Sequence, residues 1–170
     1  MKTAGLALVA GAAALMISAG SAALASGVAG GVECAPKNVT VRGAFATVYC
    51  GPAKAVVTIA GRAYRFTKGS CSTRKSILGD SAFELATGRS VPDFTQKDTD
   101  PPHFFLSVQP AAAGSHRGHI NMWHGKIWFG VSEMTIVLKP SLRAGTFSGK
   151  GIQIREGVSK RVRAMGSFSC

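Results

Sequence analysis

Acidic residues are scarce in this chain, with 8 Asp and Glu against 20 Lys and Arg and a formal net charge of +12 at pH 7. The sequence also lacks internal repeats and any linker that would separate two segments of different composition. These absences exclude a repeat architecture and favour a single domain. Helical periodicity is weak throughout, which excludes a helical bundle and leaves a β-rich domain as the prediction.

Residues 1–25 have the features of a secretory signal peptide. Lys2 precedes a run of Ala, Gly, Leu, Val, Met and Ile that carries no charge and ends in Ala23-Leu24-Ala25, a small-residue cleavage pattern. No basic stop-transfer cluster follows, so we expect cleavage and not retention as a membrane anchor. Glu33 directly precedes Cys34, which is unlike a bacterial lipoprotein signal. The sequence predicts a bacterial protein that is secreted, extracellular or located in the cell envelope, and that has no stable membrane span after cleavage.

The remaining segment, 26–170, has the length of one domain and contains all four cysteines of the chain. An even number of cysteines in an exported chain predicts two disulfides, and three pairings are possible. Our hypothesis is Cys34–Cys50 together with Cys71–Cys170. Chain entropy predicts that the first stabilises the fold by about 3 kcal/mol and the second by about 4–5 kcal/mol.

Short runs of β-branched and aromatic residues, separated by turn residues, predict strands along most of the domain. The strongest local signal is 54–67, where Gly61-Arg62 suits the two-residue loop of a type II′ hairpin. A second tight hairpin is predicted around His124-Gly125. Residues 132–138 form another expected strand, and 145–149 and 165–170 are two late strands that could pair. The predicted fold is a single antiparallel β-sandwich or partly closed barrel with little helix beyond the signal peptide.

Three further segments are harder to assign. Residues 81–87 fit either two helical turns, with Ser81 and Glu84 as a capping box, or an edge strand. The prolines and aspartates of 91–102 predict a loop, and a second loop is expected at 110–118.

The excess of positive charge is concentrated late in the chain and predicts association with anionic partners. Such partners would be anionic cell-wall polymers or lipid head groups, with no specific nucleic acid. The alternative is that the charge only keeps a small secreted protein soluble. The candidate binding residues are Lys139, Arg143, Lys150, Arg155, Lys160, Arg161 and Arg163.

Histidines are the first candidates for a metal site, because His116, His119 and His124 lie within nine residues. No carboxylate lies nearby in the sequence to complete a set of ligands, and oxidised cysteines could not serve. We therefore interpret them as solvated loop histidines and expect neither a metal nor another cofactor.

Two short motifs are typical of a hydrolase. Gly79-Asp80-Ser81 resembles the start of the GDS block of the SGNH (GDSL-type) esterases, and Asp100-Pro101-Pro102-His103 has the D-x-x-H form of their acid and base. The two blocks lie about twenty residues apart here, whereas in that family they lie at opposite ends of an α/β domain. We expect no catalytic residues.

Aromatic residues gather in the second half of the chain beside the basic segment. Basic and aromatic side chains together can bind sugars or single-stranded nucleic acid. We expect core packing instead, because a sheet of this size needs large inward side chains. The residues concerned are Phe104, Phe105, Trp123, Trp128 and Phe129.

The segment 145–149 and the terminal Gly166-Ser167-Phe168-Ser169-Cys170 resemble small exported actinobacterial proteins, the mycobacterial LpqH-type lipoprotein antigen family among them. Shared features are a V-x-I-x-G-x-x-Y element at 57–64, a mid-chain cysteine (Cys71) and a terminal cysteine after a Gly/Ser/Phe strand. The resemblance implies a mostly-β envelope protein without known catalysis, and it supports the Cys71–Cys170 pairing. This chain lacks the lipid-attachment motif, so anchoring is not implied.

Together these observations predict a non-enzymatic, secreted or envelope-associated β-domain with a ligand-binding or surface role. The alternative is an electrostatic binder of anionic polymers or lipid head groups that uses segment 139–163. A secreted hydrolase is the third hypothesis.

Overall fold

The computed structural model describes residues 35–75, 80–90 and 100–170, and these residues form strands and turns without a helix. The prediction of a mostly-β domain is confirmed. In the described ranges, no helix has the length and apolar character that a membrane crossing requires. The predicted signal peptide and most of the predicted loop at 91–102 lie outside these ranges.

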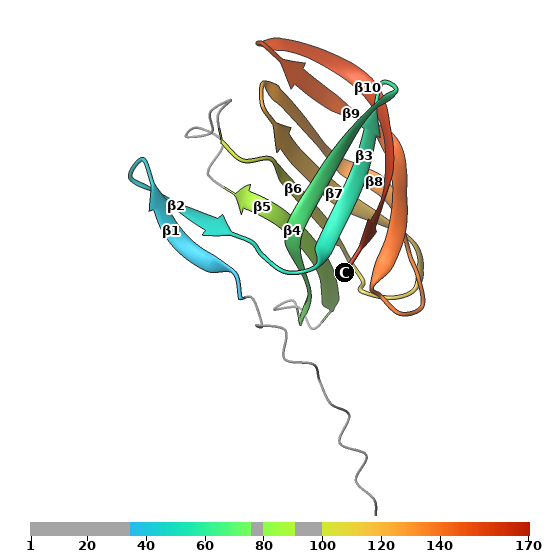
Figure 1. The fold of residues 1–170 in the computed structure, drawn as a ribbon. Coiled ribbons are helices and arrows are strands. Elements are labelled where there is room, and N and C mark those ends of the chain that lie inside the picture. The colour runs from blue at the N-terminus through green and yellow to red at the C-terminus, as the bar shows by residue number, and fades with distance from the viewer. Residues whose placement is uncertain (1–34, 76–79, 91–99) are drawn as a thin grey trace, which may run out of the picture. The chain divides into compact units, whose positions relative to one another are not determined.

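In the described residues, ten strands alternate in direction along the chain (Figure 1). They are β1 (Lys37–Val41), β2 (Ala44–Val48), β3 (Ala53–Ile59), β4 (Arg62–Lys75), β5 (Ser81–Ser90), β6 (His103–Val108), β7 (Gly114–His124), β8 (Ile127–Leu138), β9 (Ala144–Arg155) and β10 (Val158–Ser169).

Strands β3 to β10 form a closed antiparallel barrel of eight strands. Each strand pairs with the next along the chain, and β10 returns to β3 with Ala164 opposite Ile59 and Ser169 opposite Lys54. The chain therefore forms neither the predicted β-sandwich nor a partly closed barrel. Closure removes the two sheet edges that an open sheet of these strands would expose.

The core lies inside the barrel and consists of inward side chains from every strand of it. Phe66, Phe104 and Phe147 form a continuous series, with ring centroids 5.5 Å and 5.7 Å apart. Aromatic rings at these separations gain stabilisation beyond the area they bury.

Glycines opposite phenylalanines allow β9 and β10 to pack tightly. Phe147 lies opposite Gly166, and Phe168 lies opposite Gly145. A Cβ at Gly145 would come within 2.6 Å of the Phe168 ring, so each ring covers the space left by a missing side chain. The two late strands pair as predicted, and this alternation of Gly and Phe explains the sequence pattern of both.

The tight turns follow the prediction in place but not in type. The β3–β4 loop is Ala60-Gly61, with φ of 48° and 81°. Two positive φ values define a type I′ turn, so the predicted II′ turn at Gly61-Arg62 is wrong. The loop starts one residue earlier, and Gly61 occupies its second position, where a type I′ turn also requires positive φ. The predicted second hairpin is present one residue later, with Gly125-Lys126 between β7 and β8.

Two segments differ from their predicted conformation. Residues 81–87 are part of β5, an interior strand of the barrel and neither a helix nor an edge, because both β4 and β6 pair with it. The predicted loop 110–118 is shorter than expected, since β7 already begins at Gly114. The pairing available on both sides outweighs the local capping signal.

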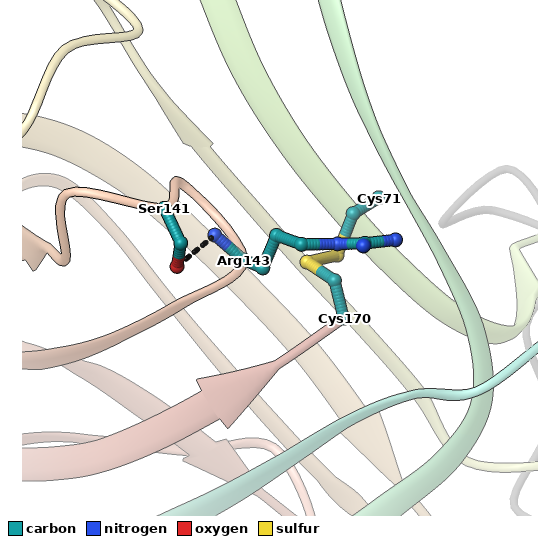
Figure 2. Close-up of a disulfide and its surroundings, with 4 residues drawn as sticks. All are labelled: Cys71, Ser141, Arg143 and Cys170. Atoms are coloured by element: carbon teal, nitrogen blue, oxygen red, sulfur yellow. Dashed lines mark hydrogen bonds between the residues drawn. A yellow bond between two sulfur atoms is a disulfide. The ribbon is translucent and has the colours of Figure 1, made fainter. Parts of the chain in front are cut away.

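A disulfide joins Cys71 of β4 to Cys170 at the end of the chain, as predicted (Figure 2). The Cys170 amide donates a hydrogen bond of 2.7 Å to the Arg143 carbonyl, and the Arg143 side chain extends alongside the disulfide. The other predicted bridge, Cys34–Cys50, includes Cys34, which lies outside the described residues.

The β1–β2 hairpin is attached to the end of β5, with Thr47 opposite Ser90 and Val48 opposite Arg89. Asp100 holds it through ion pairs to Arg42 in the hairpin turn (2.8 Å) and to Arg89 of β5 (2.7 Å). The hydrogen bond to Asp100 raises the pKa of Arg42 above its ordinary value. The Asp100 side chain is 1% exposed, so this carboxylate is a buried link between hairpin and barrel.

Candidate functional site

A groove with a volume of about 550 Å³ runs over the outer wall of the barrel across β7 to β10. We call it the basic groove. Its lining consists of His119, Trp128, Gly130, Val131, Lys150, Gly151, Ile152 and Arg161.

Strand alternation places Lys150 and Arg161, which line the groove, and the adjacent Arg163 on the outside. Val162 and Ala164 of β10 are buried in the core, so Arg161 and Arg163 between and beside them point to solvent. On β9 the buried Phe147 sets the same alternation, which directs Lys150 outward. The sequence pattern of β9 and β10 therefore produces one basic outer face.

Lys150 lies directly opposite Arg163 in the β9–β10 register, and Arg161 lies opposite Ile152. Like charges directly opposite each other on one face of a sheet destabilise the strand pair. This arrangement favours an anion between them, because a bound anion would offset the repulsion.

The described carboxylates provide no counter-charge for this cluster, because each has another partner. Lys150, Arg161 and Arg163 therefore have no ion-pair partner within the described ranges. The contacts of the described carboxylates are Asp80 with Gln109, Glu84 with Arg74, Asp100 with Arg42 and Arg89, Glu133 with Arg117, and Glu156 with Lys126.

Trp128 forms the aromatic wall of the groove, and its ring covers Gly130. A Cβ at Gly130 would lie 2.5 Å from the Trp128 ring, so only glycine leaves space for the indole. Trp123 is the cross-strand partner of Trp128. The indole Nε1 atoms of both are shielded from solvent and have no hydrogen-bond partner in the structure.

The core interpretation of the aromatic residues is correct for two of the five. Phe104 and Phe129 are fully buried inside the barrel. Phe105, Trp123 and Trp128 are half-buried on the alternating outer positions of β6, β7 and β8. Their strand parity relative to Phe104 and Phe129 is the signal that could have separated the two groups from the sequence.

Of the predicted basic residues, Lys150 and Arg161 line the groove, and Arg163 lies beside it, opposite Lys150. The other four do not line it. Arg155 and Lys160 lie beside the β9–β10 turn. Lys139 and Arg143 belong to the β8–β9 connection at the other end of the barrel, where Arg143 lies next to the disulfide (Figure 2). The structure therefore divides the predicted set by position and brings only Lys150, Arg161 and Arg163 together.

The three candidate histidines lie on β7, not in loops, and have separate surroundings. His116 Nε2 is 2.9 Å from the Ala112 carbonyl oxygen. His119 lines the basic groove, and His124 packs 5.2 Å from the Tyr64 ring. In the described part of the chain, no three metal-ligating side chains converge.

The residues of the hydrolase hypothesis are also separated. His103 lies opposite Gly88 on β5, and Ser81 is seven residues before Gly88, about 23 Å along the strand. His103 Nδ1 is 2.9 Å from the Thr87 carbonyl oxygen, and Asp100 is bound by Arg42 and Arg89. Gly79 lies outside the described residues. The structure does not bring the serine, histidine and aspartate of the motif together.

The basic groove can hold anionic groups beside an aromatic ring. Arg161 and Arg163 offer planar sets of donors that match carboxylate, sulfate or phosphate oxygens, and Lys150 adds a point charge. Comparisons with protein-family models, with curated proteins and with solved structures find no significant match to this chain.

Proposed function

We propose that this protein is an exported, non-enzymatic binding protein whose ligand is an anionic polymer held in the basic groove. The observation that carries the proposal is the opposed pair Lys150 and Arg163, with Arg161 beside them and no described carboxylate to neutralise them. A bound anion would relieve this repulsion between like charges, so the repulsion in the unliganded fold favours anion binding.

Export is the second part of the proposal. The leader predicted at 1–25 would direct the chain out of the cytoplasm, and the Cys71–Cys170 disulfide is weakly compatible with an oxidising compartment. The anionic polymers of a cell envelope would then be the available partners.

A polymer fits the groove better than a small anion. The groove is open and crosses several strands, and its cations come from two of them. An extended chain can contact all three cations at once, and each exposed contact contributes modestly.

The test is retention of the full chain on an immobilised polyanion such as heparin, with salt elution. The variant Lys150→Gln/Arg161→Gln/Arg163→Gln should bind roughly tenfold or more weakly and elute at lower salt. The matched control Lys37→Gln/Lys75→Gln/Lys139→Gln removes the same charge outside the groove.

Equal loss in the two triple variants would show a general charge effect and contradict the proposed site. Binding to vesicles of anionic lipid but not to soluble heparin would contradict a polymer ligand and favour lipid head groups. Circular dichroism and thermal unfolding of both variants establish that each is folded.

A further inference from the structure

A second groove, with a volume of about 440 Å³, lies between the β1–β2 hairpin and β4. We call it the hairpin groove. Its lining includes Tyr49, Arg65, Thr67, Lys68, Arg89 and Pro102.

The hairpin groove resembles the basic groove in its chemistry. Arg65 and Lys68 are exposed and have no ion-pair partner within the described ranges, whereas Arg89 is bound by Asp100. The half-buried ring of Tyr49 is the aromatic group of this groove, as Trp128 is of the basic groove. It stacks on His103, with ring centroids 6.2 Å apart. Each groove thus combines cations that lack an internal counter-charge with one aromatic ring.

Backbone strain at Lys68 supports a binding role for this groove. Lys68 has φ of 59°, a left-handed conformation that costs a non-glycine residue about 1–2 kcal/mol. It lies where the β3–β4 register shifts, between the Ala55–Phe66 and Ala53–Gly69 pairs. Bulges of this kind redirect a side chain and are frequent beside functional sites.

An uncharged strip connects the two grooves over β3 and β10. Its outward residues include Val56, Thr58, Met165 and Ser167, which line a third shallow groove of about 450 Å³. From the register, Arg163 of β10 and Arg65 of β4 are about 16 Å apart along this surface. A chain that leaves one groove can therefore reach the other across hydroxyl groups and no described carboxylate.

We propose that the two grooves and the strip between them form one track for a linear acidic polysaccharide. This inference rests on the proposed function and specifies its ligand class. Carboxylate or sulfate groups would bind at Lys150 and Arg161 in the basic groove and at Arg163 beside it, and at Arg65 and Lys68 in the hairpin groove.

The distribution of charge favours a polysaccharide over a nucleic acid. A nucleic acid has a phosphate on every residue, and those over the strip would lose water without meeting a cation. An acidic polysaccharide also presents hydroxyl groups, which can donate to and accept from Thr58 and Ser167. The half-buried rings of Trp128 and Tyr49 offer apolar surface to sugar rings.

The experiment is a length series of one acidic polysaccharide, heparin fragments, measured against the full chain by calorimetry. Fragments too short to span both grooves should bind one groove, and fragments that span them should bind at least tenfold more tightly through effective concentration. The variant Arg65→Gln/Lys68→Gln should abolish this gain with length and leave the affinity of short fragments in the basic groove within about twofold.

The control Lys37→Gln/Lys75→Gln removes two charges elsewhere and should keep the gain with length. A gain that persists in Arg65→Gln/Lys68→Gln, or is absent from the unmodified chain although short fragments bind, overturns the track and leaves the proposed function intact. Failure of both short and long fragments to bind overturns the proposed function itself. Tighter binding of an oligothymidylate of matching contour length, with the same dependence on Arg65 and Lys68, overturns the ligand class.

Discussion

Lys150 and Arg163 show at the scale of single residues how binding and stability can oppose each other. They face each other across β9 and β10 and have no described counter-charge. Replacing Lys150 by Gln should therefore stabilise the unliganded fold, by a few tenths to about 1 kcal/mol, and weaken binding to a polyanion. Urea unfolding and heparin elution measure the two effects on the same variant.

Lys160 offers the matched control for this prediction, because its cross-strand partner is the neutral Gln153. Lys160→Gln should change the free energy of unfolding by less than about 0.5 kcal/mol. If Lys150→Gln were the less stable of the two variants, repulsion between Lys150 and Arg163 would not be a feature of the unliganded fold.

Tyr49 gives the fold a dependence on high pH. Burial raises the pKa of its phenol above the ordinary value of 10.0, with a further rise from Glu84 and opposing effects of Arg74 and Thr47. A raised pKa in the folded state means that the neutral phenol is favoured by folding. The contribution of Tyr49 to stability is thus complete below pH 10 and is lost as pH rises through the folded-state pKa.

The Tyr49→Phe variant tests this assignment. Its free energy of unfolding should fall less steeply above pH 10 than that of the unmodified chain, and the tyrosine absorbance change at high pH should be smaller, because Tyr64 is then the remaining tyrosine. Identical pH profiles for the two proteins would contradict the assignment to Tyr49. Phe keeps the aromatic ring beside His103, so the comparison isolates the hydroxyl group.

At the scale of elements, Asp100 determines how firmly the β1–β2 hairpin is held. Asp100→Asn removes the charge that binds Arg42 and Arg89 and should cost about 1–3 kcal/mol, because one partner of each buried pair is lost. Among the described residues, two register pairs connect β2 to β5, so the loss should be local. Hydrogen exchange should accelerate at hairpin amides and stay slow in β8 and β9.

The exposed pair of Arg74 and Glu84 serves as the control for Asp100→Asn. Glu84→Gln should change stability by less than about 1 kcal/mol and leave hairpin exchange unaltered. Uniform acceleration across all strands in Asp100→Asn would show that the hairpin and barrel open as one unit.

The alternation of side chains could be predicted from the sequence, and much of the fold follows from it. Segments 145–149 and 165–170 were predicted as two late strands that could pair, and they do pair in β9 and β10. The predicted basic residues Lys150, Arg161 and Arg163 do meet on one face, but their convergence depends on the β9–β10 register, which only the paired strands define.

Other features had no local signal. Arg42-Gly43 and Glu156-Gly157 are turns with two positive φ values each, although neither begins with the Asn or Asp that favours this conformation. The β5 strand was ambiguous because Ser81 and Glu84 also suit a helix start. Closure of the barrel depends on β10 meeting β3, a contact between distant parts of the chain. The Lys68 bulge is defined by the β3–β4 register shift, which no local sequence signal announced.

At the scale of the whole molecule, each described carboxylate has a partner within the structure, and the outer wall of β9 and β10 is left positive. Asp100 fixes the hairpin, Glu133 joins β7 to β8, and Glu156 pairs with Lys126 across neighbouring turns. The described acids therefore have partners within the structure, whereas the cations of the basic groove have no described counter-charge and can meet an external anion. This division is the molecular basis of the proposed function.

The Cys71–Cys170 disulfide should contribute more to stability than any single side-chain contact, because it joins residues separated by 99 positions in sequence. On the chain-entropy model a loop of this length is worth about 4–5 kcal/mol. It also fixes the last residue of the chain beside the seam where β10 closes on β3. The variant Cys71→Ala/Cys170→Ala should unfold at much lower urea concentration than the oxidised chain.

Removing the disulfide should lower the stability of the fold and leave polyanion binding unchanged, because the bridge is at the far end of the barrel from the basic groove. Below its unfolding transition, Cys71→Ala/Cys170→Ala should elute from heparin at the same salt concentration as the unmodified chain. Loss of heparin binding while circular dichroism still shows a folded barrel would mean that the bridge also positions Lys150, Arg161 and Arg163. If heparin binding is lost only when the circular dichroism signal of the folded barrel is also lost, the disulfide contributes to stability and not to binding. This is the result expected from the separation of the two sites.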